Sequence, residues 1–240
     1  MGAMTAPMIV EGLQGSLRPR GWPYGTILVT MDVYFFDCDK TLYDYDFHKR
    51  LPRLAELGGV SQYRLASTWW AGGHERAAEI GEYATSDEYL DAFAEVTGAR
   101  LTLAQWQDAR KAAMTSIDGS IAALHTAAGL GTVSLLSNNP IPFKDSLPVL
   151  TPEIVDVLRD NDLVSAVLGA RKPERRIYTR ALGRFGVEPE NAILFDDSLA
   201  NVEGAREAGM HAHHFTRNAD GSFDTAGMVA AIHAFAERER

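Results

Sequence analysis

Two aspartates one residue apart follow an apolar segment near the start of the chain. The segment Val33–Phe36 consists of β-branched and aromatic residues, and Asp37 and Asp39 follow it. Such a run predicts a buried strand, where charged groups are stable only when they are paired or bind a metal ion. Because open α/β sheets bind ligands at the carboxyl ends of their strands, the two aspartates form a candidate site.

Two carboxylates at this spacing repel each other, and two arrangements relieve the repulsion. A divalent cation with a preference for oxygen ligands, such as Mg²⁺, can bind between them. Alternatively, one carboxyl stays protonated and acts as an acid beside an ionised neighbour. Both arrangements suit phosphoryl transfer, in which an aspartate can act as the nucleophile. A strand end with an Asp turn capped by Thr41 is the simple structural alternative.

Three later segments place further polar groups where the site would need them. Ser137 and Asn138 end a second strand-like run, Lys172 precedes a proline at a predicted helix start, and Asp196 and Asp197 end a third strand-like run. Each segment alone has an ordinary reading as a helix cap, a solvated charge or a turn. Their joint occurrence with the first motif, three of the four motifs standing at strand ends, strengthens the interpretation of Asp37 and Asp39 as a catalytic site.

The order Asp-x-Asp-x-Thr, Ser-Asn, Lys-Pro and Asp-Asp resembles the haloacid dehalogenase superfamily of hydrolases. The resemblance extends over about residues 32–215. It implies that Asp37 is the nucleophile, that Asp39 is the general acid and base, that Thr41 supports the loop and orients Asp37, and that Lys172 neutralises the nucleophile and the phosphoryl group.

The resemblance also implies a Mg²⁺ cofactor and a phosphoryl-binding set. The metal ligands implied are Asp37, the backbone carbonyl of Asp39, Asp196 and Asp197. The phosphoryl-binding residues implied are Ser137, Asn138 and Lys172. We add His48, together with its neighbours Lys49 and Arg50, as a candidate for substrate contact, because it closely follows the first motif and loop residues on rigid scaffolds often bind ligands.

Asp39 separates two branches of the superfamily. The dehalogenases that the pattern resembles lack an acid at this position, because a halide leaving group needs no proton. The sequence therefore favours a phosphatase that hydrolyses a small phosphorylated metabolite, such as a sugar phosphate or nucleoside monophosphate, through an aspartyl-phosphate. The alternatives are a phosphotransferase or mutase that uses the same intermediate, and a non-catalytic binding protein.

The elements around these motifs predict an α/β fold with a doubly wound parallel sheet. Strand-like and helical segments alternate after residue 119. Ser137 follows Asp37 by 100 residues, which is more than one crossover needs. We therefore expect residues 31–43 and 119–240 to form a Rossmann-like core, residues 44–118 to form an inserted helical cap, and residues 1–30 to be an N-terminal extension.

Composition narrows the possible partners and location. The 240-residue chain carries a net charge of −9, so nucleic-acid binding is not expected. No apolar stretch approaches the ~20 residues of a membrane span. The single cysteine suits a reducing compartment, and we expect a cytoplasmic protein. The oligomeric state is not readable from the sequence.

Two side-chain roles stay open at this point. Asn201 follows Asp197 by four residues, and it either hydrogen-bonds a metal ligand or caps the following helix. The neighbours Trp69 and Trp70 either line a substrate pocket or pack inside the cap, and at most one of them can face a cleft because adjacent helical residues point about 100° apart.

Overall fold

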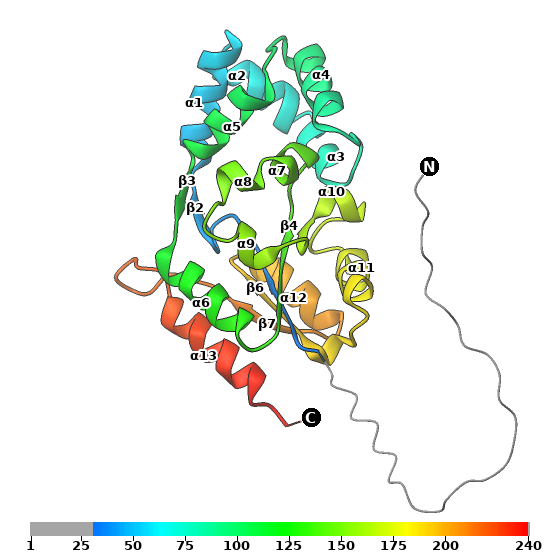
Figure 1. The fold of residues 1–240 in the computed structure, drawn as a ribbon. Helices are drawn as coiled ribbons and strands as arrows, with labels where there is room; N and C mark the ends of the chain where they lie inside the picture. The colour runs from blue at the N-terminus through cyan, green and yellow to red at the C-terminus, as the bar shows by residue number, and fades with distance from the viewer. Residues whose placement is uncertain (1–30, 240) are drawn as a thin grey trace, which may run out of the picture.

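The computed structural model describes residues 31–239, which form a parallel sheet with helices on both faces and a helical insertion above it (Figure 1). The five strands lie in the order β5-β4-β1-β6-β7 and all neighbours are parallel. These strands are β1 (Val33–Phe36), β4 (Thr132–Ser137), β5 (Asp162–Val164), β6 (Ala192–Asp196) and β7 (His211–His214). The expected doubly wound α/β fold is confirmed. The predicted extension falls on residues 1–30, outside the described range.

The central strand β1 packs against both helical layers because successive side chains point to opposite faces. Tyr34 and Phe36 lie in the core under α6 (Asp118–Ala128) and α13 (Thr225–Ala236). Val33 and Phe35 lie in the opposite core with α11 (Arg175–Phe185) and α12 (Leu199–Glu207). All four side chains are fully buried, which explains the continuous apolar run in the sequence.

The remaining helices of the sheet domain are short and lie in the connections between strands. They are α7 (Ile141–Asp145), α8 (Leu147–Leu150), α9 (Val155–Leu158), α10 (Ser165–Leu168) and a 3₁₀ turn, η2 (Pro189–Asn191). The apolar run Val164–Leu168 reads as a strand in the sequence, but β5 ends at Val164 and α10 begins at Ser165. Periodicity cannot separate strand from helix in so short an apolar run.

Strand register brings the sequence motifs to one edge of the sheet. Phe36 pairs with Leu135 of β4 on one side and with Phe195 of β6 on the other. The residue after Phe36 is Asp37, so its position is level with Leu136 and Asp196, and Ser137 is one residue further along. The motifs are distant in sequence but meet because three parallel strands end together.

The insertion leaves and rejoins the sheet domain through two short antiparallel strands. These strands are β2 (Tyr43–Tyr45) and β3 (Met114–Ser116), in which Tyr43 pairs with Ser116. The helices between them are α1 (Phe47–Gly58), α2 (Gln62–Leu65), a π-helical turn η1 (Ala66–Trp70), α3 (His74–Glu79), α4 (Ser86–Thr97) and α5 (Leu103–Lys111). Figure 1 shows these helices grouped above the carboxyl ends of the core strands.

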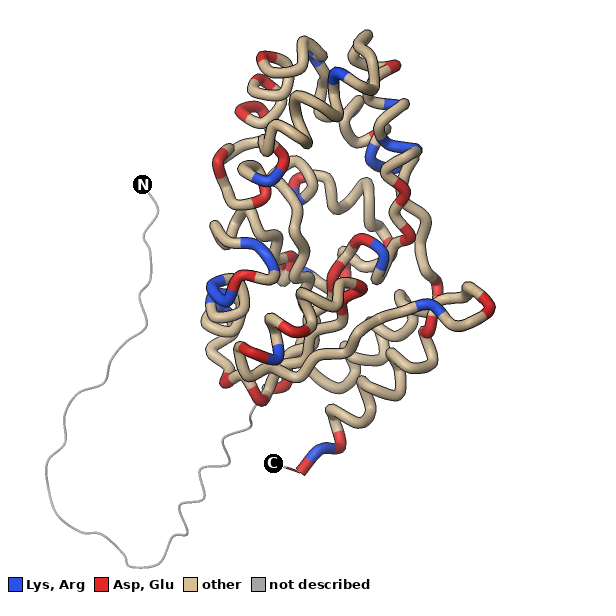
Figure 2. The backbone as a smooth tube through the Cα atoms, turned by 180° about the vertical axis from the view of Figure 1, so that it is seen from behind, with Lys and Arg blue, Asp and Glu red and all other residues tan. Residues whose placement is uncertain are grey.

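An aromatic cluster forms the centre of the insertion. Trp69 is fully buried, contacts Tyr89 and Phe93 with ring centroids 5.1 and 4.9 Å away, and donates its Nε1–H to Glu75 at 2.5 Å. Trp69 therefore belongs to the core of the insertion, and only the neighbouring Trp70 is partly exposed. Acidic and basic positions are interspersed along both parts of the chain (Figure 2). Among residues 31–239, no helix is both apolar enough and long enough for a membrane crossing.

The insertion is joined to the sheet domain by polar contacts. Ser86 on α4 donates to Asp145 at 2.6 Å, and Gln107 on α5 donates to Ser146 at 3.0 Å. Glu79 at the end of α3 lies 2.9 Å from Nε of Arg171. Burial raises the pKa of Glu79 to about 7, although the Arg171 guanidinium acts in the opposite direction.

We expect the Glu79→Gln variant to be more stable than the wild type at pH 8 and equally stable at pH 4.5. A folded-state pKa above the ordinary value of 4.5 means that stability falls as the pH rises from about 4.5 to about 7. The shift corresponds to at most about 3 kcal/mol at pH 8. Urea denaturation at both pH values measures the difference, with Glu56→Gln on the exposed surface of α1 as the control. A pH-independent difference for Glu79→Gln would contradict the prediction.

Candidate active site

Asp37 is held in place by three donors at the carboxyl end of β1. Its Oδ1 accepts hydrogen bonds from the backbone N–H of Cys38 at 2.8 Å and from Ser137 Oγ at 2.7 Å, and Lys172 Nζ lies 3.0 Å away. The side chain of Asp37 is only 11% exposed. Burial raises the pKa of Asp37 to about 7, although Lys172 acts in the opposite direction, and the neighbouring Asp196 adds a smaller increase.

Lys172 connects the first and last strand motifs. Its Nζ lies 2.5 Å from Asp196 Oδ2 as well as 3.0 Å from Asp37 Oδ1, and its side chain has no exposed area. Burial acts to lower the pKa of Lys172, but the carboxylates of Asp196 and Asp37 raise it above its ordinary value. The ammonium group is therefore held in its charged form between two carboxylates.

Three carboxylates form an acidic cluster beside Lys172. Asp37, Asp196 and Asp197 each have an oxygen within 4.8 Å of the others. Burial and the neighbouring Asp196 raise the pKa of Asp197. One lysine against three carboxylates leaves an excess of negative charge in a largely buried place, and closely spaced carboxylate oxygens are the ligands that Mg²⁺ prefers. The donor set fits a hard divalent cation.

Two asparagines orient members of this cluster. Asn201 donates from Nδ2 to both oxygens of Asp196, at 2.9 and 3.2 Å. Of the two roles open in the sequence, Asn201 thus bonds a carboxylate of the acidic cluster. The Asn138 side chain accepts from the backbone N–H of Lys172 at 2.9 Å and donates to its carbonyl at 3.0 Å. These two bonds fix the backbone of the segment that carries the lysine.

Asp39 has a partner that sequence reasoning missed. Arg110 on α5 of the insertion places Nη2 2.6 Å from both Oδ1 and Oδ2 of Asp39. The guanidinium also lies over the rings of Tyr45 and Phe143, at 4.3 and 5.0 Å from their centroids. The one available signal was the spacing from Trp106, a buried residue one helical turn earlier, which puts Arg110 on the inner face of the helix.

Arg110 is linked to Asp37 as well as to Asp39. The same Nη2 donates to Asn139 Oδ1 at 3.3 Å, and Asn139 Nδ2 donates to Ser137 Oγ at 3.0 Å. Ser137 in turn donates to Asp37. A continuous chain of hydrogen bonds therefore runs from one aspartate to the other through a residue of the insertion.

Two other predicted residues lie outside this network. Thr41 is fully buried two residues after Asp39, and its Oγ1 has no hydrogen-bond partner among the described residues. His48 is exposed on the first turn of α1, where its backbone N–H donates to Asp46. Their roles in loop support and substrate contact stay predictions.

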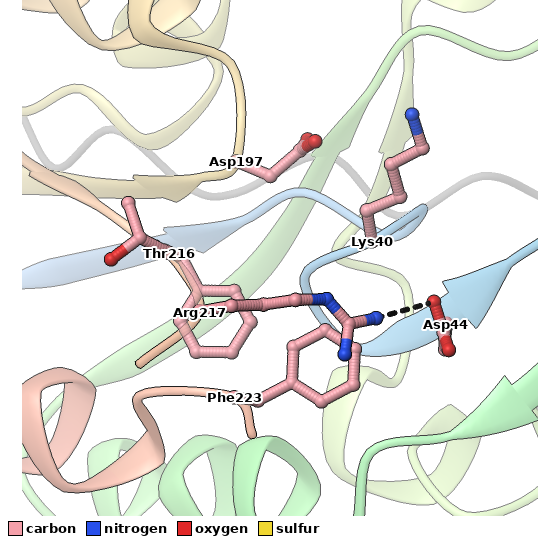
Figure 3. Close-up of a pocket in the computed structure, with 7 residues that line it drawn as sticks. Lys40, Asp44, Asp197, Thr216, Arg217 and Phe223 are labelled. Carbon is pink, nitrogen blue, oxygen red and sulfur yellow. Dashed lines mark hydrogen bonds and ion pairs between the residues drawn. The ribbon is translucent and has the colours of Figure 1, made fainter. Parts of the chain in front are cut away.

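A cavity of about 380 Å³ opens beside the acidic cluster (Figure 3). Asp197 and Lys40 line one part of it, and Phe223 and Arg217 line another. Arg217 lies with its guanidinium carbon 3.7 Å from the Phe223 ring centroid and pairs with Asp44 at 3.2 Å. The cavity reaches the cluster at Asp197, whereas Asp37 and Asp39 do not line it.

The family of the chain follows from these motifs and from a match over most of the described residues. Residues 31–209 match the sequence profile of the haloacid dehalogenase-like hydrolases. The chain belongs to this family. The match covers strands β1, β4, β5 and β6, and it therefore includes the acidic cluster at the strand ends and the loop that carries Lys172.

Curated relatives with similar sequences include two phosphatases. A phosphatase of Mycobacterium tuberculosis is 36% identical over 91 residues, which is 36% of this chain and 39% of that protein. The chain thus matches well under half the length of this relative. Glyceraldehyde 3-phosphate phosphatase of Pyrococcus furiosus is 23% identical over 187 residues, which is 74% of this chain and 78% of that protein.

Solved structures with the same fold include two proteins named for this family. A HAD-like hydrolase of Porphyromonas gingivalis superposes with a TM-score of 0.68 at 20% identity, covering 88% of this chain and all of that one. A HAD family enzyme of Bacteroides thetaiotaomicron, in complex with magnesium and inorganic phosphate, gives a TM-score of 0.62 at 20% identity, covering 79% of this chain and 95% of that one. These likenesses establish the fold.

Proposed function

We propose that the chain is a Mg²⁺-dependent phosphomonoester hydrolase that acts through an aspartyl-phosphate. The observation that carries the proposal is the position of Lys172, which lies within 3.0 Å of Asp37 and 2.5 Å of Asp196. A buried ammonium beside a buried carboxylate lowers the charge that an approaching phosphoryl group meets. Asp39, two residues from the nucleophile, is available to handle the leaving-group proton.

The reaction would proceed in two steps, formation and hydrolysis of the aspartyl-phosphate. First, Asp37 Oδ2 attacks phosphorus, the bond to the leaving oxygen breaks, and Asp39 donates a proton to that oxygen so that an alcohol departs. Second, a water molecule attacks phosphorus and gives a proton to Asp39, the bond to Asp37 breaks, and orthophosphate leaves. Oδ1 of Asp37 is already occupied by its three donors, so Oδ2 is the oxygen available for attack.

The protein residues around these steps bind and orient the phosphoryl group. Ser137 Oγ and Lys172 Nζ both border Asp37 and would bind phosphoryl oxygens, with the Asn138 backbone beside them. Asp37, Asp196, Asp197 and the backbone carbonyl of Asp39 would hold the Mg²⁺. When bound, the metal supplies positive charge that offsets the carboxylates and the transferring phosphoryl group.

The substrate class is a small phosphorylated metabolite, with no nucleic acid or membrane as partner, and we place the enzyme in the cytoplasm. The name of the Pyrococcus relative, a glyceraldehyde 3-phosphate phosphatase, supports a small sugar phosphate as one member of this class. The retained acid at Asp39 argues for a phosphate ester over a halide as the leaving group, because a halide needs no proton.

Phosphate release tests the proposal. We expect wild-type protein with Mg²⁺ to release orthophosphate from p-nitrophenyl phosphate and from members of a panel of sugar phosphates and nucleoside monophosphates, and we expect EDTA to stop the release. Release of p-nitrophenol without orthophosphate, and only when a second alcohol is added as the phosphoryl acceptor, would indicate a phosphotransferase. A folded protein that releases no phosphate under any of these conditions would contradict the hydrolase.

A further inference from the structure

The contact between Arg110 and Asp39 conflicts with the proposed role of Asp39 as the general acid and base. Both carboxylate oxygens of Asp39 lie 2.6 Å from Nη2 of Arg110. The leaving oxygen of a substrate needs one of these two oxygens within hydrogen-bond distance. Arg110 must therefore give up at least part of this contact whenever Asp39 engages a substrate.

Arg110 has few other hydrogen-bond acceptors among the described residues once it leaves Asp39. The residue is 2% exposed, and its other side-chain acceptor among residues 31–239 is Asn139 Oδ1 at 3.3 Å. Its Nε has no hydrogen-bond acceptor among the described residues. A buried guanidinium that loses its carboxylate is strongly unfavourable unless another anion takes that place.

A second buried arginine adds to the unpaired donors at this position. Arg50 is 3% exposed, and its Nε and Nη2 also have no acceptor within the described part of the chain. Its Nη1 lies 3.3 Å from the hydroxyl of Tyr45, whose ring lies beneath the guanidinium of Arg110. Glu75 neutralises Arg50 in part, at 3.8 Å from Nη1, but its Oε2 is also occupied by Trp69 and Tyr89.

We propose that Arg110 binds a second anionic group on the substrate, with Arg50 as its cationic neighbour, and thereby determines specificity. The anion is a carboxylate or a second phosphate on the leaving group, close enough to the ester oxygen to replace Asp39 at the guanidinium. The substrates are then phosphorylated acids or bisphosphates. This inference rests on the proposed phosphatase function and narrows it to one substrate class.

Matched pairs of substrates test the inference in the wild-type protein. 2-Phosphoglycolate and 2-hydroxyethyl phosphate differ by a carboxylate in place of a CH₂OH group, and 3-phosphoglycerate and glycerol 3-phosphate differ in the same way. A comparison of fructose 1,6-bisphosphate with fructose 6-phosphate tests whether the preferred anion is a second phosphate or a carboxylate. We expect kcat/KM to be about 10- to 100-fold higher for the member with the extra anion.

Variants of Arg110 assign this preference to the residue. In Arg110→Gln we expect the ratio of kcat/KM within each pair to fall to about one, and in Arg110→Lys, which keeps the charge and loses the planar fork, we expect an intermediate ratio. Arg53→Gln is the matched control, because Arg53 also lies in the insertion and pairs with an aspartate, Asp108 at 2.6 Å, on the exposed surface. Its ratio should equal that of the wild type.

Binding to the inactive Asp37→Asn protein gives a readout that does not need turnover. Calorimetric titration with Mg²⁺ present should show tighter binding of 2-phosphoglycolate than of 2-hydroxyethyl phosphate, and Arg110→Gln in the same background should abolish the difference. Equal kcat/KM values for both members of each pair in the wild type would overturn the inference, and so would an unchanged ratio of these values in Arg110→Gln. Neither result would contradict the proposed phosphatase function. Absence of phosphate release from every compound would instead overturn the proposed function, and the titration would still decide whether Arg110 recognises the anion.

Discussion

The Asp37→Asn variant is expected to release phosphate at least about 1,000-fold more slowly than the wild type. A carboxamide cannot form the aspartyl-phosphate, whereas its carbonyl oxygen can still accept from Ser137 and the Cys38 backbone, which donate to Oδ1 at 2.7 and 2.8 Å. The geometry of the strand end should therefore survive while the covalent step is lost. Phosphate release from p-nitrophenyl phosphate with Mg²⁺ measures the effect.

The same variant should be at least as stable as the wild type at pH 8 in EDTA. Because burial raises the pKa of Asp37 to about 7, ionising this carboxyl costs stability as the pH rises from about 4 to about 7, and asparagine does not bear that cost. Asp91→Asn on the exposed surface of α4 is the control and should match the wild type in turnover. Turnover within tenfold of the wild type in Asp37→Asn would remove this residue as the nucleophile.

The Lys172→Met variant is expected to lose stability and activity together. The substitution removes the buried ammonium that pairs with Asp37 and Asp196, so the acidic cluster keeps its negative charge and loses this cationic partner. Breaking a buried ion pair by removing one partner typically destabilises by about 3–5 kcal/mol. Turnover should fall by about 100- to 1,000-fold, because a preorganised charge at the phosphoryl group is removed.

Mg²⁺ should distinguish this loss from an ordinary packing defect. We expect the Lys172→Met protein to regain part of its stability in urea denaturation when Mg²⁺ is added, because the cation offsets the same carboxylates. Lys144→Met is the matched control, since Lys144 pairs with Asp162 at 2.5 Å with a side chain that is 33% exposed. A change of less than about 1 kcal/mol is expected there. Equal destabilisation of the two variants would contradict the buried role of Lys172.

The sequence alone was sufficient to predict the sheet and the residues at its carboxyl edge. Asp37, Ser137 and Asp196 each end an apolar run, and parallel strands that end at one edge must bring such residues together. Periodicity carries this information because a buried strand needs an unbroken apolar run and a polar residue marks its end. Lys172 lies on a loop, and only the resemblance to a known family assigned it to the site.

The partner of Asp39 depends on contacts that no local pattern records. Arg110 is 71 residues away in sequence, and it reaches Asp39 only because the insertion folds over the edge of the sheet. The start of its helix at Thr102 was readable from a capping residue, but the direction in which that helix points was not. The three-residue strands β2 and β3 were missed because alternation cannot be recognised over so few residues.

The antiparallel pair of β2 and β3 has a consequence for how this architecture can vary. Tyr45, the last residue before the insertion, is a ladder partner of Met114, the first residue after it. The two ends of the inserted segment are therefore neighbours at a fixed spacing of about 5 Å, whatever lies between them. A segment of any length that begins and ends at one point can be exchanged, shortened or enlarged without moving the core strands. The insertion, which carries the proposed specificity residue Arg110, can thus diverge independently of the sheet domain, which carries the proposed catalytic residues.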